Sequence, residues 1–240
     1  MTLYASVTQP RLLDLFCGGG GAAKGYQRAG FHVTGVDIKA QPRYCGEEFV
    51  QGDALEFCRE HGHEFDVIHA SPPCQSHIKG LAAVNRLRGR KPRHQDLIPQ
   101  TRAAIEKTGL PYVIENVEGA PLLCPIKVCG TYFNLPIRRH RLFESNLMLF
   151  GVDCRHQRFR EKRFYSSYGQ FRGRPPRMTS TVVQVFGNPS NAAKKEWGPA
   201  LGIDWMDWRE LSQAIPPCYT FFIGKQLMSI LEGRSCSPAH

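Results

Sequence analysis

A short apolar segment that runs directly into four glycines constrains the fold of this chain more than any other feature. Arg11 to Phe16 have the composition of a buried strand, Gly18 to Gly21 form a loop, and Ala22 to Ala29 have the pattern of a helix ended by Gly30. A strand, a tight loop and a helix in this order begin a sheet with helical crossovers. The glycine loop also lets a ligand approach the backbone without side-chain clashes.

The same alternation of strands and helices continues through the first half of the chain. Further strands are predicted at 31–36, 49–50, 65–70 and 111–116, with helices at 54–60 and 100–107 between them. This order predicts an α/β fold, a Rossmann-like doubly wound sheet. In such sheets the chemistry lies at the carboxyl ends of the strands.

Composition and charge indicate one sizeable domain with a polyanionic partner. The 240 residues include 31 Lys and Arg against 21 Asp and Glu, a formal net charge of +10. After Glu144 the chain becomes rich in arginine, glycine, proline and aromatic residues. We expect a main domain over 1–144, a small basic lobe over 145–200, and a segment over 201–240 that returns to the main domain.

No membrane or secretory role is indicated. Residues 1–10 lack the apolar core of a signal peptide, and no apolar run has the ~20 residues that a bilayer span needs. Nine cysteines without regular spacing do not suggest a disulfide framework. We therefore expect reduced thiols and a cytoplasmic location, and a monomer without an obligate protein partner.

Four short segments in a fixed order carry the chemistry of the chain. They are Asp14-Leu15-Phe16-Cys17-Gly18-Gly19-Gly20-Gly21, Pro72-Pro73-Cys74-Gln75, Glu115-Asn116-Val117 and Arg139-His140-Arg141. The contiguous glycines do not form the G-x-G-x-x-G pattern of a dinucleotide site. The ordered set resembles the DNA (cytosine-5) methyltransferase family. The resemblance implies a class I methyltransferase fold, S-adenosyl-L-methionine as cofactor, and methylation of cytosine in duplex DNA, as in restriction-modification.

Cys74 is the candidate nucleophile. Carbon 5 of cytosine is too weak a nucleophile to take a methyl group directly, and addition of a thiolate to carbon 6 activates it. Two prolines fix the backbone before Cys74, which matches the family's Pro-Cys-Gln segment together with Gln75. A target base in a duplex must leave the stack to reach this thiol.

A carboxyl group and two guanidiniums complete the expected catalytic set. The resemblance implies that Glu115 protonates or hydrogen-bonds ring nitrogen 3, which a desolvated pocket favours. Arg139 and Arg141, two positions apart on a strand, point the same way and can hold the cytosine oxygen, Glu115 or a phosphate. Asn116 is expected to hold the pocket through hydrogen bonds.

The resemblance also implies a cofactor site along the strand ends. Phe16 would pack on the adenine, Asp37 would accept the ribose hydroxyls, and Asp53 would reach the adenine amino group. A last motif around Gln213 and Ala214 is expected beside the glycine loop. The expected cofactor-binding residues are Asp14, Phe16, Cys17, Gly18, Gly20, Asp37, Ile38, Asp53, Pro72, Gln213 and Ala214.

Basic residues in two segments are expected to contact the nucleic acid. The loop after Cys74 would close over flipped DNA, and the basic lobe would read the target. Because a small lobe reaches few base edges, we expect a short target of roughly two to four base pairs. The expected substrate-binding residues are Gln75, Asn116, Arg86, Arg88, Arg90, Arg158 and Arg172.

Parts of the sequence are also compatible with two other functions and with one metal site. The same motifs fit a tRNA cytosine-5 methyltransferase, and the fold could serve a catalytically silent nucleic-acid-binding relative. Cys124, Cys129, Cys154 and His156 could in principle bind zinc. Their irregular spacing favours buried or incidental thiols, so no metal is expected.

Overall fold

A computed structural model describes residues 9–73, 96–158, 182–183, 185 and 191–235. A seven-stranded sheet forms its centre, with the order β3-β2-β1-β4-β5-β7-β6. The strands are β1 (Arg11–Leu15), β2 (His32–Asp37), β3 (Glu48–Gln51), β4 (Val67–Ala70), β5 (Tyr112–Asn116), β6 (Ile126–Cys129) and β7 (His140–Ser145). The first five pair in parallel, as the sequence predicts.

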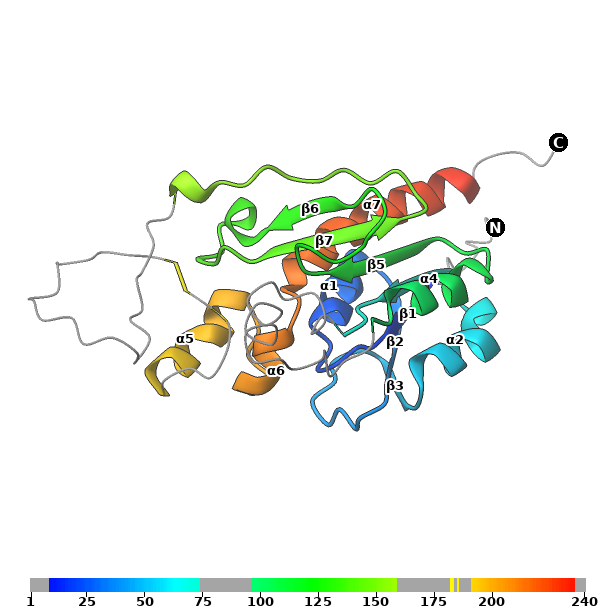
Figure 1. The fold of residues 1–240 in the computed structure, drawn as a ribbon, viewed down its shortest axis with the longest axis horizontal. Coiled ribbons are helices and arrows are strands. Elements are labelled where there is room, and N and C mark those ends of the chain that lie inside the picture. The colour runs from blue at the N-terminus through cyan, green and yellow to red at the C-terminus, as the bar shows by residue number, and fades with distance from the viewer. Residues whose placement is uncertain (1–8, 74–95, 159–181, 184, 186–190, 236–240) are drawn as a thin grey trace, which may run out of the picture.

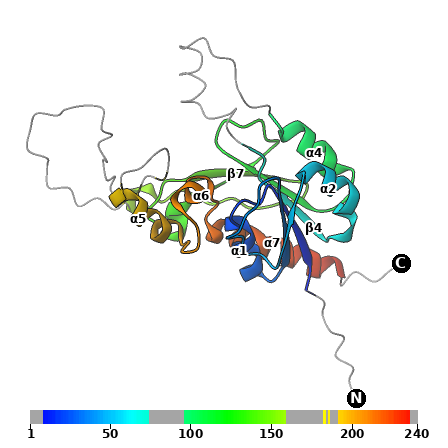
Figure 2. The ribbon, with the colours of Figure 1, turned by 90° about the horizontal axis from the view of Figure 1, so that it is seen from below.

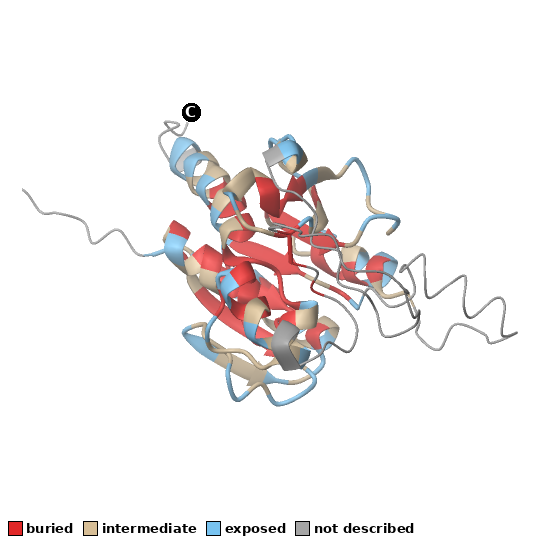
Figure 3. Ribbon diagram, turned by 90° about the vertical axis from the view of Figure 1, so that its left-hand side faces the viewer, coloured by how far each residue is buried: buried red, intermediate tan, exposed pale blue. Residues whose placement is uncertain are grey.

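Helices cover both faces of this sheet and give three layers (Figures 1 and 2). On one face α1 (Gly21–Ala29) packs against the long C-terminal α7 (Pro217–Ser235), and on the other α2 (Ala54–His61) packs against α4 (Ile98–Glu106). The red core of Figure 3 lies between these layers. It includes fully buried Leu12, Tyr26 and Tyr219 on the α1 face. The architecture is the Rossmann-like doubly wound fold predicted above.

β7 runs against the other strands of the sheet, which the sequence pattern did not indicate, while β6 beyond it again runs with the parallel strands. β7 is antiparallel to β5, with Asn116 opposite Leu142, and β6 is antiparallel to β7, with Cys129 opposite His140. Because of this reversal, the amino end of β7 lies at the same edge as the carboxyl ends of the parallel strands. The arginines at the start of β7 therefore reach the edge where chemistry is expected.

The C-terminal part of the chain lies against the glycine loop and α1. The Trp205 indole N–H donates to the Gly19 carbonyl at 2.8 Å, and Thr220 Oγ1 donates to the Ala22 carbonyl at 2.8 Å. A side chain at Gly25 would collide with Thr220, so glycine permits this close packing. The remaining elements are η1 (Gly62–Glu64), η2 (Gly130–Phe133), η3 (His156–Arg158), α5 (Asn191–Leu201) and α6 (Trp208–Gln213).

Within the described residues, no helix has the length and apolar character that crossing a membrane requires.

Candidate active site

The glycine loop turns sharply between β1 and α1. Phe16, Gly18 and Gly20 have positive φ angles of 59°, 50° and 83°, a conformation that glycine adopts without strain. The Gly18 amide donates to Asp37 Oδ2 at 3.0 Å, which ties the loop to the end of β2. A Cβ atom built on Gly18 would meet no atom within 4 Å, so open space borders the loop backbone here.

Asp14 is a fully buried carboxyl group beneath this loop. Burial, with a further contribution from the charge of Asp37, raises the pKa of Asp14 well above its usual range, and the nearby Ala23 amide offsets only part of this. Neither carboxyl oxygen has a hydrogen-bond partner among the described residues. An unpartnered buried acid is costly, so Asp14 is suited to pairing with a ligand donor.

The other residues expected at the cofactor site differ in their surroundings. Asp37 is half-buried and accepts the amides of Gly18 and, at 2.9 Å, Lys39, which leaves carboxylate lone pairs for further donors. Ile38 is 68% exposed. Asp53 caps α2 by accepting the amides of Leu55 and Glu56 at 2.8 and 2.9 Å, so it has a structural role whether or not it also contacts a ligand.

The thiols near the loop are poor nucleophiles. Burial and the charges of Asp14 and Asp37 raise the pKa of Cys17 far above its usual value. Burial likewise raises the pKa of Cys45 to about 11 and that of Cys218 to about 12. Such groups stay protonated near neutral pH and behave as small apolar side chains.

Two hydrogen bonds anchor the segment that leads to Cys74. The Ser71 amide donates to the Leu15 carbonyl at 3.1 Å, which joins the ends of β4 and β1. Buried Asn116 donates from Nδ2 to the Pro72 carbonyl at 3.0 Å, and its Oδ1 accepts the Val117 amide at 2.9 Å. The end of β5 is thereby fastened to Pro72, two residues before the nucleophile candidate.

Glu115 and Arg141 meet in the interior at this edge. Arg141 Nε lies 2.7 Å from Glu115 Oε1, and the two side chains are only 12% and 7% exposed. The contact is an ion pair and not a hydrogen bond, and Glu115 Oε1 has no hydrogen-bond partner among the described residues. Burial raises the pKa of Glu115, although Arg141 and Arg139 oppose the shift. The carboxyl is therefore biased toward its proton-carrying form.

Arg139 has a different environment from Arg141. Its guanidinium donates from Nη1 to the Val185 carbonyl at 2.9 Å and from Nη2 to the Ser212 carbonyl at 2.8 Å. The Tyr219 hydroxyl donates to the backbone carbonyl of Arg139. Arg139 thus joins the start of β7 to two distant segments, a bracing role that its motif did not reveal.

The C-terminal motif is only partly near the loop. Ala214 is buried and Gln213 is exposed at the end of α6. Ile215 is the residue in direct contact, since a side chain at Gly21 would lie 2.5 Å from the Ile215 carbonyl. Trp205, bonded to Gly19, was missed by the motif comparison, although its place in the apolar return segment was a signal for it.

A buried pair on the α1 face was also missed by the sequence interpretation. The Tyr26 hydroxyl and His69 Nδ1 lie 3.0 Å apart, and both side chains are fully buried. Burial lowers the pKa of His69 to about 3, so the imidazole is neutral. Asp14 is opposite His69 in the β1–β4 register, so a group of buried polar side chains underlies the glycine loop.

Several predicted site residues lie outside the described residues. The structure therefore gives no placement for them, and their roles stay predictions. They are Cys74, Gln75, Arg86, Arg88, Arg90, Arg172 and the side chain of Arg158.

Comparison with solved structures identifies the fold. A protein described as a DNA modification methyltransferase, encoded within an Escherichia coli prophage, is 15% identical over 93% of this chain and 100% of its own, with a TM-score of 0.55. The Dnmt2 methyltransferase of S. pombe is 15% identical over 93% and 99%, with a TM-score of 0.58. A DNMT2 variant from Spodoptera frugiperda is 12% identical over the same shares, with a TM-score of 0.53.

The chain has the fold of these methyltransferases. The alignments span nearly the whole length of both partners, so the second half of the chain is included in the likeness. No protein-family model matches the sequence, and no curated protein matches it. At these identities the likeness establishes architecture alone, and the activity has to be argued from the site.

Proposed function

We propose that this protein transfers a methyl group from S-adenosylmethionine to carbon 5 of cytosine in duplex DNA, through a covalent adduct between Cys74 and a flipped-out base. The observation that carries the proposal is the bridge between Asn116 and Pro72. It fastens Glu115, biased toward protonation and paired with Arg141, to the segment that leads into Cys74. Acid and cation thus lie at one edge of the sheet, beside the described segment that precedes Cys74 in the sequence.

The residues around the glycine loop fit the proposed cofactor. Asp14 offers buried carboxyl oxygens without a partner, and open space borders Gly18. Phe16 is half-buried, and Asp37 retains lone pairs suited to hydroxyl groups. These residues would hold S-adenosylmethionine, which when bound supplies an electrophilic methyl group.

The roles of the protein groups follow from their chemistry. The Cys74 thiolate adds to carbon 6 while the Glu115 carboxyl gives its proton to ring nitrogen 3, so electron density moves to carbon 5. Arg141 then faces a Glu115 carboxylate whose charge it stabilises. After methylation, a base removes the carbon 5 proton, and the electrons of that bond expel the sulfur as a thiolate. The Glu115 carboxylate takes back the proton from ring nitrogen 3, which restores the neutral aromatic ring and the acid.

A basic cavity supports a polyanionic substrate. The cavity, of about 730 Å³, lies between α1, α5 and the loop before α6. Four cationic side chains, those of Lys24, Arg28, Lys194 and Lys195, and one acidic side chain, that of Asp204, line it. Such a concentration of positive charge beside the cofactor loop suits backbone phosphates. The short target of roughly two to four base pairs, which depends on the basic lobe, remains part of the proposal.

Covalent trapping tests the proposal directly. The protein is incubated with S-adenosylmethionine and duplex DNA containing 5-fluorocytosine, with a transfer RNA carrying the same base as competitor. We expect an adduct with DNA that survives denaturation, that Cys74→Ala abolishes and that Cys124→Ala, a change at an exposed thiol, retains. Methyl transfer that persists in Cys74→Ala would refute the covalent mechanism, and exclusive trapping of RNA would replace DNA as the substrate.

A further inference from the structure

Two cysteines and two histidines converge on the far side of β7 from the arginines. Cys129, His140, Cys154 and His156 each offer one ligand atom, and these atoms all lie within 4.8 Å of one another. His140 Nε2 is 3.1 Å from His156 Nε2 and 3.3 Å from Cys154 Sγ, and Cys129 Sγ is 3.3 Å from His156 Nε2. From this geometry we infer that the four side chains bind a structural zinc ion.

The distances match a tetrahedral site. Zinc lies about 2.3 Å from sulfur and about 2.0 Å from nitrogen, which places neighbouring ligand atoms roughly 3.3–3.8 Å apart. Three of the six separations, 3.1–3.3 Å, are within a few tenths of an ångström of that range, and the remaining ones do not exceed 4.8 Å. A set of two sulfurs and two imidazoles is a common combination for structural zinc.

Hydrogen bonding alone accounts poorly for the cluster. Nε2 of His140 has either one proton or one lone pair, yet it has two neighbours within 3.3 Å. A single cation satisfies all four ligand atoms at once. Because Cys129 is fully buried, no substrate can use it as a nucleophile.

The fold prepares this site before any ion binds. Cys129 and His140 are directly opposite in the β6–β7 pairing, so their side chains share a face of the sheet. The segment with the other two ligands is held alongside by the Val152 amide on the Lys127 carbonyl at 3.2 Å and by the Arg155 amide on Thr131 Oγ1 at 3.1 Å.

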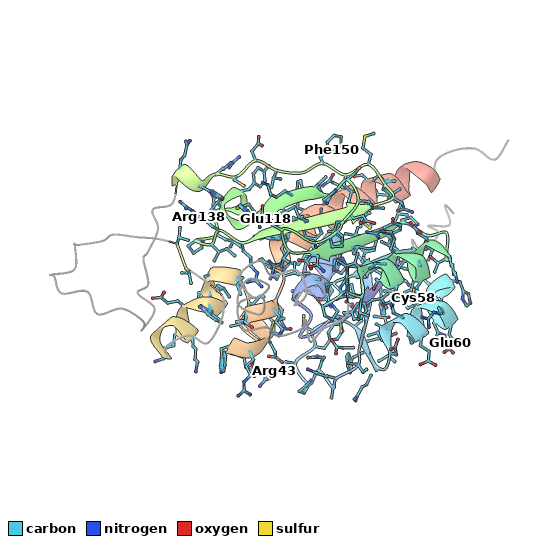
Figure 4. All side chains as sticks on the ribbon, viewed as in Figure 1. Arg43, Cys58, Glu60, Glu118, Arg138 and Phe150 are labelled. Carbon is cyan, nitrogen blue, oxygen red and sulfur yellow. The ribbon has the colours of Figure 1, made fainter. Side chains whose placement is uncertain are left out.

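An outer carboxylate completes the arrangement. Glu118 (labelled in Figure 4) has Oε2 2.9 Å from His140 Nδ1. A carboxylate here fixes the proton on Nδ1 and leaves the Nε2 lone pair for a metal, as outer-shell carboxylates do at zinc sites. The site differs from the set that sequence spacing suggested, because Cys124 is exposed and outside the cluster while His140 belongs to it.

Zinc would fasten the chain after β7 back onto the sheet edge. Cys129 belongs to β6 and His140 to β7. Cys154 and His156 belong to the segment after β7, whose described part stops at Arg158. His140 stands between Arg139 and Arg141, so the ion would steady the strand that carries both guanidiniums. The inference is independent of the proposed methyl transfer, since it concerns a buttress on the opposite face.

Metal analysis of the untagged, full-length protein tests the inference. We expect about one zinc ion per chain after exhaustive dialysis. Cys154→Ser and His156→Asn should reduce the zinc content at least tenfold, while Cys124→Ser retains it. X-ray absorption of the unaltered protein should show two sulfurs at about 2.3 Å and two nitrogens at about 2.0 Å.

A second readout avoids dependence on folding of the variants. A chelator that removes zinc should lower the melting temperature of the unaltered protein and leave that of Cys154→Ser unchanged. Absence of zinc after reconstitution under reducing conditions would overturn the inference. So would a shell of three or more sulfurs, or a Cys129–Cys154 disulfide in the reduced protein.

Discussion

Replacement of Asn116 by alanine tests whether the bridge to Pro72 positions the catalytic segment. The side chain is 1% exposed and forms two backbone hydrogen bonds, one to the Pro72 carbonyl at 3.0 Å and one from the Val117 amide at 2.9 Å. The substitution removes both and leaves no polar atom to replace them. The proline carbonyl belongs to a buried residue, so water cannot freely take over.

The expected cost follows from these contacts. Each lost hydrogen bond contributes about 1 kcal/mol, and a buried acceptor left without a donor adds about 1–3 kcal/mol. The total for Asn116→Ala is about 3–5 kcal/mol, which in a domain of this size lowers the melting temperature by roughly 6–20 °C. Release of the proline pair should also displace Cys74, and a misplacement of about 1 Å can cost roughly 100-fold in rate.

Asn146→Ala is the matched control. Asn146 bridges backbone in the same manner at the other end of β5, accepting the Tyr112 amide and donating to the Leu110 carbonyl, both at 2.9 Å. It is exposed, so its loss should cost less stability and leave turnover of the folded protein unchanged. The assay is the single-turnover rate of adduct formation on 5-fluorocytosine DNA, at a temperature where both variants are folded. Equal rates in the two variants would refute the positioning argument.

Three further substitutions probe other buried groups. Glu115→Gln should lower kcat about 10²–10⁴-fold. Burial raises the pKa of Glu115 despite Arg141, so wild-type activity should fall as the pH rises through the pKa of this carboxyl. A fall in activity at high pH that persists in the variant would contradict the role of Glu115 as proton donor. His69, whose pKa burial lowers to about 3, stays neutral in the fold while the unfolded chain takes up a proton below pH 6.5. Stability should therefore decline by up to about 1.4 kcal/mol per pH unit as pH falls from 6.5 toward 3, and His69→Phe should flatten that slope in urea titrations; parallel slopes would exclude this cause. Glu144→Gln should lower the free energy of unfolding by about 3 kcal/mol, because Arg102 loses the carboxylate that it binds through Nε and Nη2 at 2.6 and 2.7 Å. A denaturant midpoint equal to that of the wild type would show that the pair does not stabilise the fold.

The parallel half of the fold could be predicted because its strands are buried on both faces. Segments such as Val67–Ala70 and Tyr112–Asn116 are continuous runs of buried residues next to turn-forming ones, a local signal. β7 and β6 gave weaker signals, since β7 mixes charged and apolar residues and is only partly buried. The reversed direction of β7 depends on its pairing with β5 and β6, which no short window of sequence contains.

The site divides in the same way between local and distant information. A contact with the Glu115 carboxyl was one of three roles expected for Arg139 and Arg141, and protonation of Glu115 was expected from a desolvated pocket. The partners of Arg139 are carbonyls 46 and 73 residues away, so its bracing role could not be predicted from the motif. Sequence spacing named three of the four members of the cluster around His140 but included Cys124 in place of His140, since Cys129 and His140 come together only when β6 and β7 pair.

Strand alternation at the start of β7 gives one short segment two separate duties. Arg141 enters the Glu115 pocket, while His140, the residue before it, faces the opposite side and joins Cys129, Cys154 and His156. Because the two side chains point to opposite faces of the strand, a change at His140 reaches the guanidinium through the backbone, where the His140 carbonyl accepts Arg141 Nη1 at 3.1 Å. Zinc loss should therefore lower the rate of adduct formation by less than Arg141→Ala does, and it should leave the pH dependence set by Glu115 in place.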